Sequence, residues 1–340
     1  MSNTAPYFLP SNQFDHFYRG GDRIGALRNG PGGPMRPEEW IGSSTTRFGE
    51  KSSGLSTLPT GTLLRDAIEN DPQGWLGADL VAHSGSSSEI LVKLLDPAQR
   101  LPVHFHPNKA FAKKHLALNH GKTEAWIILE APEGARVGLG FKEKMSKQSV
   151  SEMVSARDSK GLLDSLDRFE VHSGDTVLVP AGVPHAIDSG IFVLELQEPT
   201  DLSALLEWEG FAVDGEKDGH LGVGFDTVLD ALRYNPVNDK SSLLTSPGLT
   251  GGEQRSLLAT SADGYFRADL LPGNGEVSAS FTVLLVLENE GVLKTGQGDQ
   301  LAVTRGDALV IPFNSGGFSL SGATAVACRP PLPSLAELSE

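Results

Sequence analysis

Short apolar runs separated by turn residues dominate the chain and predict a mainly β protein. Many short strands at close spacing, with glycine in the turns, are typical of a sandwich or barrel. Loops and short strands are expected over residues 1–60. The later predicted strands cover residues 90–95, 101–106, 124–130, 137–141, 169–179, 191–196, 202–208, 266–271, 278–287, 291–295, 307–312 and 324–329.

Four segments have helical rather than alternating patterns. Residues 63–69 carry apolar positions at helical spacing. Residues 107–118 begin with a proline, which suits a first helical turn, and residues 147–166 indicate a polar surface insertion. A further helical piece, 227–234, lies within a connection rich in glycine, aspartate and asparagine.

Two segments of the chain resemble each other. Gly174-Asp-Thr-Val-Leu-Val-Pro and Gly306-Asp-Ala-Leu-Val-Ile-Pro share the same form, which suggests two related β modules. The second has Phe318 in the region where the first has His185, and no histidine follows residue 221. We expect an N-terminal domain over residues 1–210, with the helical insertions 107–118 and 147–166. A connection over 211–250 and a C-terminal domain over 251–340 should follow.

Composition narrows the classes of partner. The chain has 340 residues and a formal net charge of −15, which argues against nucleic acid and against an anionic membrane surface. Its single cysteine, Cys328, cannot form an internal disulfide, which fits a reducing compartment. No signal peptide and no apolar stretch of membrane-spanning length is recognised, so a cytoplasmic location is expected.

His104, Phe105 and His106 form the most informative chemical pattern. Side chains alternate along a strand, so the two imidazoles should share one side and Phe105 should face the other. Glu124, at the head of an apolar strand, and His185, beyond a proline-rich turn, can complete a set of metal ligands. Three imidazoles and a carboxylate suit Zn, Fe, Mn, Co or Ni and leave positions open for a substrate.

A single histidine in a strand is more often an unrelated polar residue than a ligand. The pair His104 and His106, together with His185 after a turn, favours metal binding over that interpretation. The remaining histidines have no such spacing and are interpreted as ordinary polar residues: His16, His83, His115, His120, His172 and His220.

Together these features resemble the cupin superfamily, and within it the type I mannose-6-phosphate isomerases. The Gly-Lys-Thr-Glu-x-Trp run after a His-Pro-Asn segment is the more specific match. The resemblance implies two cupin jelly-roll β-barrels with short helical insertions, the second of them, about 250–332, without a metal. The matching stretches are Glu39-Trp-Ile-Gly, Lys93-Leu-Leu, residues 103–109, Gly121-Lys-Thr-Glu-Ala-Trp, residues 174–185 and Leu194-Glu-Leu-Gln.

The resemblance implies one zinc ion. Carried over by position, its ligands are His104, His106, Glu124 and His185. The family usually has glutamine in place of His104, and an imidazole there is still a good ligand. Three histidines and one glutamate are also the general ligand set of cupin oxidases and dioxygenases, so an iron or manganese oxygenase is an alternative.

The resemblance also implies the reaction, an interconversion of mannose 6-phosphate and fructose 6-phosphate through an enediolate. Lys122 shares a strand face with Glu124 and is the candidate proton shuttle or oxyanion partner. Glu195 is a second acid–base candidate. Lys109 and Arg100 are the basic groups expected to bind substrate at the mouth of the site.

Two further positions depart from the family pattern. Pro102 stands where the family commonly has a serine that helps hold the substrate phosphate. Leu205 stands near the position at which bacterial relatives have an arginine implicated in catalysis. These departures favour two alternatives, an isomerase of an unphosphorylated or different sugar and a non-catalytic sugar-binding protein. A sugar or sugar phosphate is the expected partner, and the chain is expected to be a monomer or homodimer.

Overall fold

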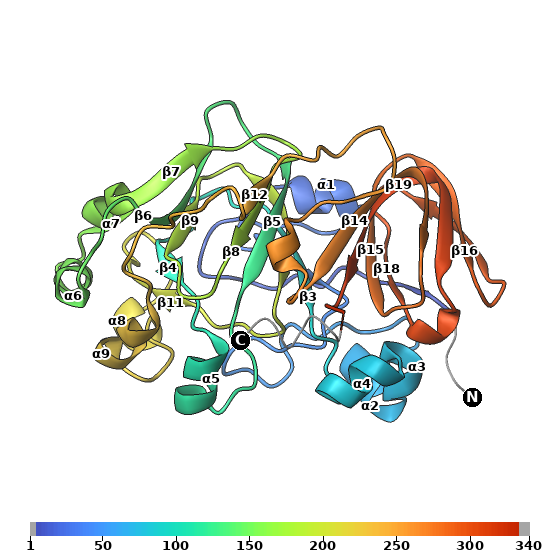
Figure 1. Cartoon of the computed structure of the whole chain (residues 1–340), viewed down its shortest axis with the longest axis horizontal. Coiled ribbons are helices and arrows are strands. Elements are labelled where there is room, and N and C mark those ends of the chain that lie inside the picture. The colour runs from blue at the N-terminus through green and yellow to red at the C-terminus, as the bar shows by residue number, and fades with distance from the viewer. Residues whose placement is uncertain (1–4, 333–340) are drawn as a thin grey trace.

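The computed structural model describes residues 5–332, and most of its regular structure is β. Figure 1 shows two β regions side by side, the N-terminal one on the left and the C-terminal one on the right. Short helices lie at the periphery of both. This arrangement confirms the prediction of a mainly β protein with short helical insertions.

Two antiparallel sheets form the N-terminal region. Both run through strands that are distant in sequence. The six-stranded sheet has the order β12 (Leu244–Thr245), β8 (Thr176–Val179), β5 (Glu124–Glu130), β10 (Phe192–Gln197), β3 (Leu91–Leu95) and β2 (Glu38–Ile41). The five-stranded sheet has the order β11 (Ala204–Leu205), β4 (His104–Phe105), β9 (His185–Ile187), β6 (Arg136–Phe141) and β7 (Leu166–Glu170).

The C-terminal sheet has eight strands. Its main order is β1 (Tyr7–Phe8), β18 (Ala308–Ile311), β15 (Thr282–Glu288), β19 (Phe318–Arg329), β14 (Arg267–Val277) and β13 (Arg255–Ser256), and β16 (Glu290–Thr295) joins β17 (Gln300–Thr304) to β19. Strand β1, from the start of the chain, therefore lies in this sheet. The proposed domain boundaries stay predictions.

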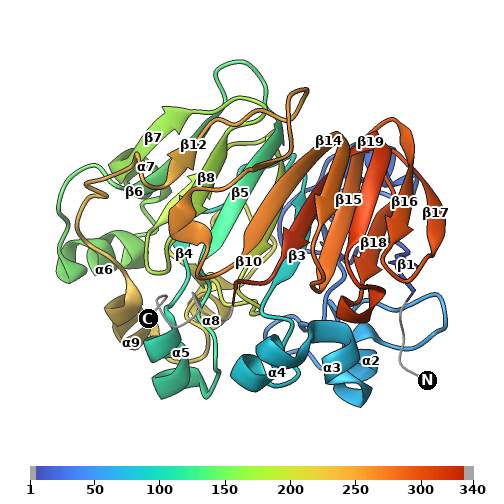
Figure 2. The same cartoon turned by 45° about the vertical axis from the view of Figure 1, so that its right-hand side comes forward.

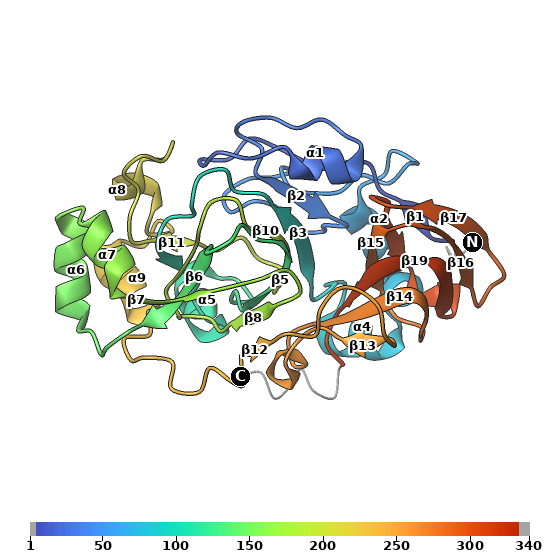
Figure 3. The same cartoon turned by 90° about the horizontal axis from the view of Figure 1, so that it is seen from above.

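The six-stranded sheet lies between the five-stranded sheet and the C-terminal sheet (Figures 1 and 3). Its central strands β3, β5 and β10 are buried along nearly their whole length. Strands buried in this way read as continuous apolar runs, because neither face meets water. A charged residue inside such a run therefore needs a partner.

Short helices lie at the edges of the sheets. Figure 2 shows α2, α3 and α4 grouped below the C-terminal sheet. Helix α5 starts after Asn108, whose side chain accepts a hydrogen bond of 2.9 Å from the Phe111 amide. The α-helices are α1 (Arg23–Arg28), α2 (Leu64–Asn70), α3 (Pro72–Leu76), α4 (Ala78–Ser84), α5 (Lys109–Leu116), α6 (Lys147–Ser155), α7 (Ser159–Ser165), α8 (Gly215–Asp218) and α9 (Phe225–Val228). Three 3-10 turns follow at η1 (Leu229–Ala231), η2 (Thr260–Ala262) and η3 (Phe313–Ser315).

Several predicted elements have different bounds in the structure. The single strand predicted over 169–179 is wrong, because a turn at Gly174, with φ of 89°, separates β7 from β8. The strands predicted over 101–106 and 202–208 shrink to two residues each in β4 and β11. The insertion over 147–166 is two helices, and β17, α1, α3 and α4 were not predicted. None of the helices between residues 5 and 332 is long and apolar enough to cross a membrane.

Candidate active site

Three buried imidazoles lie together between the two N-terminal sheets. His104 on β4 and His185 on β9 are direct cross-strand partners, and their Nε2 atoms are 3.0 Å apart. His106 follows β4, and the ring centroids of His104 and His106 are 5.0 Å apart. The predicted placement of this pair on one side is confirmed. The candidate ligand nitrogens of all three residues lie within 4.8 Å of one another.

Hydrogen bonds to the backbone fix the tautomer of each ring. The Nδ1 atoms of His104, His106 and His185 lie 2.8, 2.6 and 2.9 Å from carbonyl oxygens of the main chain. A carbonyl only accepts, so each Nδ1 must carry the proton and donate it. Each neutral ring then turns an Nε2 lone pair towards the other two, an arrangement that a shared cation stabilises.

Glu124 adds a carboxylate from the opposite sheet. Its Oε2 lies 3.0 Å from His106 Nε2, and its Oε1 lies 3.3 Å from His185 Nε2. The indole of Trp126 donates to Oε1 at 2.9 Å and fixes the carboxylate. Three neutral nitrogens and one carboxylate fit a divalent transition metal, so these four residues could hold one.

Burial keeps the imidazoles neutral. It lowers the pKa of His106 to about 3, with Lys122 adding to the effect, and it lowers the pKa of His185 to about 3 as well. Burial would raise the pKa of Glu124, but the charge of Lys122 outweighs it and holds that pKa well below its usual range. The site therefore presents its ligands in the protonation states that metal binding requires.

A tight turn places His185 at the start of β9. The turn contains Gly182, whose φ of 85° is left-handed and whose amide donates to the carbonyl of His106 at 2.6 Å. A Cβ at this position would lie 2.7 Å from the Ala231 carbonyl oxygen, so the turn needs glycine. The hydrogen bond ties the segment carrying one ligand to the backbone of another.

Charged residues form a row across the six-stranded sheet. In its register, Trp40 pairs with Lys93, Lys93 with Glu195, and Glu195 with Trp126. Directly opposed residues share a face of the sheet, so the two charges lie between two indoles. Lys93 Nζ lies 3.8 Å from Glu195 Oε2 and 4.5 Å from the centroid of the Trp40 ring.

Lys122 joins this row to the histidines. Its Nζ lies 3.0 Å from Glu124 Oε2, 3.2 Å from His106 Nε2 and 3.7 Å from Glu195 Oε1. Burial opposes its charge, but Glu124 and Glu195 outweigh burial and raise the pKa of Lys122. Burial and then the charge of Glu124 raise the pKa of Glu195 well above its usual range. The site thus combines a permanent ammonium with a carboxyl group that retains its proton to higher pH.

The structure adds a second polar cluster that the sequence reasoning missed. Glu38 accepts hydrogen bonds from Tyr18 at 2.6 Å and from Trp40 at 2.8 Å, and it lies 3.6 Å from Lys93 Nζ. His16, interpreted from the sequence as an ordinary polar residue, lies 3.5 Å from Glu38. Lys93 had a usable signal, because it interrupts the apolar run of β3 and a buried lysine needs a partner.

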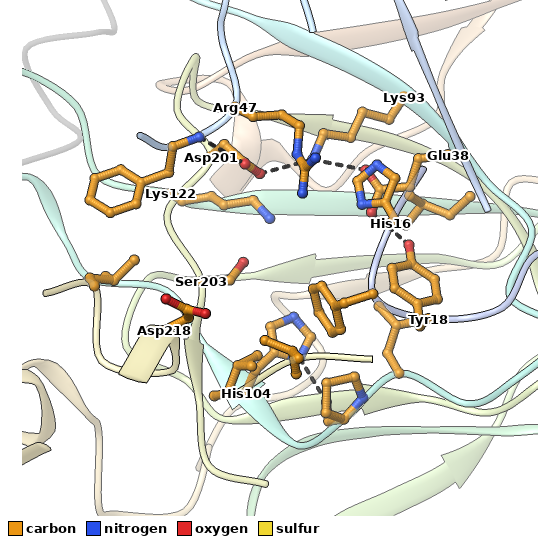
Figure 4. A pocket seen from close by; sticks show the side chains of 18 of the residues that line it. His16, Tyr18, Glu38, Arg47, Lys93, His104, Lys122, Asp201, Ser203 and Asp218 are labelled. Atoms are coloured by element: carbon orange, nitrogen blue, oxygen red, sulfur yellow. Dashed lines mark hydrogen bonds and ion pairs between the residues drawn. The ribbon is translucent and has the colours of Figure 1, made fainter. Parts of the chain in front are cut away.

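Side chains from both clusters line a cavity of about 930 Å³, among them His104, His185, Glu124, Lys122, Lys93 and Glu38. Figure 4 shows His104 and Arg47 on opposite sides of it, with Lys93 on the same side as Arg47 and Lys122 between the two sides in the view. Pro102 and Leu205, where the sequence departs from the family pattern, also line the cavity.

The two predicted substrate-binding residues lie elsewhere. Arg100 forms a two-point ion pair with the buried Glu207, and neither Arg100 nor Lys109 is part of the cavity wall. Their proposed roles stay predictions.

Comparisons with known proteins agree with this architecture. No protein-family model matches the chain. A mannose-6-phosphate isomerase of Streptococcus mutans is 30% identical over 241 residues, which is 69% of this chain and 72% of that protein. Another from Bacillus subtilis is 27% identical over 70% of this chain and 73% of its own length.

Solved structures show the same fold. A mannose 6-phosphate isomerase structure from Bacillus subtilis matches with a TM-score of 0.72 at 22% identity, over 96% of this chain and 99% of that one. The apo form of the Salmonella typhimurium enzyme matches with a TM-score of 0.72 at 18% identity, over 97% of this chain and all (100%) of that one. With a curated relative 30% identical over more than two thirds of its length, the chain belongs to the mannose-6-phosphate isomerase family.

Proposed function

We propose that the protein is a metal-dependent aldose–ketose isomerase that interconverts mannose 6-phosphate and fructose 6-phosphate through an enediolate. The observation that carries the proposal is the convergence of three tautomer-fixed Nε2 atoms and the Glu124 carboxylate, with His104, Glu124 and His185 lining a cavity. Relatives named for this reaction support it. Zinc is the first candidate ion, with iron, manganese, cobalt and nickel as alternatives.

His104, His106, Glu124 and His185 are the proposed ligands. An ion held by them would act as a Lewis acid and stabilise the negative charge that develops on the sugar oxygens. The backbone contacts at Nδ1 orient each ring in advance, so ligand geometry is set by the fold. Burial of all four side chains keeps water away from them and strengthens electrostatic interactions with a bound sugar.

Lys122 and Glu195 are the proposed proton-handling pair. Lys122, flanked by Glu124 and Glu195, stays charged and can donate hydrogen bonds to an oxygen that becomes anionic. The raised pKa of Glu195 makes this group, in its ionised form, a stronger base than an ordinary glutamate carboxylate. It is the candidate to accept the proton from one sugar carbon and return it to the neighbouring carbon.

An unphosphorylated sugar is the second candidate substrate. Pro102 and Leu205 favour it, because both line the cavity and neither can donate a side-chain hydrogen bond to phosphate. A 3-His-1-Glu oxygenase and a non-catalytic sugar-binding protein are the remaining alternatives.

Elemental analysis joined to a coupled isomerase assay tests the proposal. We expect about one divalent ion per chain. Turnover of mannose 6-phosphate should continue without oxygen, and free mannose is assayed beside it. Glu124→Gln should lower metal content and turnover together. Lys122→Met should keep the metal and lower kcat by about 100-fold or more.

Two outcomes would contradict the isomerase. Metal-loaded protein that binds either sugar and converts neither is a sugar-binding protein. Oxygen consumption linked to sugar loss, with no ketose formed, identifies an oxygenase.

A further inference from the structure

We propose that Arg47 forms an anion subsite at the end of the cavity remote from the metal ligands, where its guanidinium binds the phosphate of the sugar. This inference rests on the proposed function, which places carbons 1 and 2 of the sugar at the metal ligands. The phosphate on carbon 6 must then lie towards the other end of the cavity. The cavity wall at that end includes Arg47.

A chain of charged contacts shows where Arg47 lies relative to the metal ligands. From Lys122 beside the histidines, it passes to Glu195, then to Lys93, and from Lys93 to Asp201 at 3.9 Å. Asp201 in turn accepts a hydrogen bond of 3.1 Å from the amide of Phe48, the residue after Arg47. The segment that carries Arg47 is therefore attached to the far end of this chain.

The deep cations of the cavity are already matched by carboxylates. Lys93 has Glu38, Glu195 and Asp201 within 4 Å, and Lys122 has Glu124 and Glu195. A phosphate dianion approaching either lysine would also meet these carboxylates. Neither lysine is therefore well placed to hold it.

Arg47 differs from both lysines. Among the residues that the structure describes, no carboxylate lies within ion-pair distance of its guanidinium. Its one hydrogen bond, to the Asp15 carbonyl, is long at 3.4 Å, and the group rests 5.4 Å from the centroid of the Phe14 ring. A guanidinium has five N–H donors in a fork that matches two phosphate oxygens. Arg47 is half-buried, which reduces screening of its charge without closing access from the cavity.

Lys217 is the other cation on the wall without an ion pair among the described residues, and it is exposed. Two acidic neighbours, Asp214 and Asp218, share this part of the wall. Solvent screening and these carboxylates make it the weaker anion site.

The test compares mannose 6-phosphate with free mannose on metal-loaded protein. Arg47→Met should raise KM for mannose 6-phosphate by about tenfold to 100-fold, the value of a charge-assisted hydrogen-bonded contact. The kcat/KM for free mannose should change by less than about twofold, because that sugar has no phosphate to lose. The KM of Arg47→Lys for mannose 6-phosphate should lie between those of the wild type and Arg47→Met, since lysine keeps the charge but lacks the forked N–H donors. Inhibition of mannose turnover by inorganic phosphate should weaken in Arg47→Met.

Arg36→Met is the matched control. Arg36 contacts Asp15 as well, through an exposed ion pair of 3.1 Å, but does not line the cavity. Arg36→Met should leave KM and kcat/KM unchanged for both substrates. Equal effects of Arg47→Met on both sugars, no effect on either, or a shift in KM only with Lys217→Met would each overturn the assignment.

The outcomes separate this inference from the proposed function. A wild-type protein that isomerises free mannose and ignores the phosphorylated sugar would remain an isomerase without an Arg47 subsite. If neither sugar turns over, the isomerase proposal fails. Calorimetric binding of mannose 6-phosphate then still tests Arg47, because Arg47→Met must weaken it relative to mannose.

Discussion

The two β modules share a local frame and differ in what it holds. Gly174 and Gly306 open equivalent turns with φ of 89° and 90°, and each precedes a buried four-residue strand, β8 or β18. A glycine-containing turn then leads to a strand that begins with His185 in the first module and Phe318 in the second. The sequence echo therefore corresponds to a structural one.

The surroundings of these two residues diverge completely. His185 faces other imidazoles and a carboxylate, whereas Phe318 belongs to a cluster of buried apolar side chains within the C-terminal sheet. One frame thus supports a reactive polar interior or an inert core, depending on which side chains point inward. The fold alone does not specify chemistry.

The largest expected effect follows from giving the first module the residue of the second. His185→Phe removes one ligand and places a phenyl ring in the site. We expect metal loss and a fall in turnover greater than about 100-fold. Replacing even a residue that only supports a metal ligand typically lowers metal affinity or activity by about 10- to 100-fold. Elemental analysis and the isomerase assay measure both. His172→Phe, at an exposed site before the Gly174 turn, is the control. Retention of metal and turnover in His185→Phe would contradict the assignment of His185 as a ligand.

The second prediction concerns the apolar module. Phe318→Ala should lower the free energy of unfolding by about 3 kcal/mol or more, because it opens a cavity in a packed core. Denaturant unfolding measures this loss. Metal content and KM should stay at wild-type values, since Phe318 contacts none of the proposed ligands. Phe8→Ala, at an exposed position in β1, should change stability by less than about 0.5 kcal/mol. A change in metal content in Phe318→Ala would mean that the modules are coupled more tightly than their separate cores indicate.

The sequence predicted the grouping of the proposed ligands in the first module better than the groups that surround them. His104 and His106 were readable because alternation along a strand places i and i+2 on one side, and Glu124 begins a strand whose bounds matched the prediction. Contacts between side chains on strands distant in sequence could not be predicted. Glu38 and Lys93 meet through cross-strand register, which no local pattern specifies. Arg47 lies in a loop, where periodicity carries no information.

Elements with mixed patterns were predicted least well. Strand β17 exposes most of its side chains and has only Val303 fully buried, so its apolar signal is weak. The short helix α3 begins after a cap at Asp71, whose side chain accepts a hydrogen bond from the Gly74 amide at 3.0 Å, and α4, which follows Gly77, has no side-chain cap. Helices of so few residues are not stable in isolation, so their sequences carry little helical periodicity.

The smallest expected effect is a pH dependence of stability that arises in the first module. His120 Nε2 lies 3.0 Å and 3.1 Å from the two carboxylate oxygens of Glu89, outside the metal site. Burial lowers the pKa of His120, but Glu89 outweighs it and raises that pKa above its ordinary value of 6.5. Burial would raise the pKa of Glu89, but His120 outweighs it and lowers that pKa below its ordinary value of 4.5. Glu198 adds to the effect on His120 and Lys109 opposes it.

The two shifts act in different pH ranges. A raised histidine pKa stabilises the fold fully below 6.5 and stops doing so as pH rises through the folded-state value. A lowered glutamate pKa stabilises it fully above 4.5 and stops doing so as pH falls through the folded-state value. The His120–Glu89 pair therefore contributes most to the free energy of unfolding between about pH 4.5 and 6.5. His120→Gln keeps an N–H donor and removes the titration, so it should cost roughly 1 kcal/mol in that window and less towards pH 8. Denaturant midpoints across pH 4.5–8 measure the difference, with the exposed His172→Gln as control. A pH-independent loss in His120→Gln would show that His120 acts by packing rather than by charge.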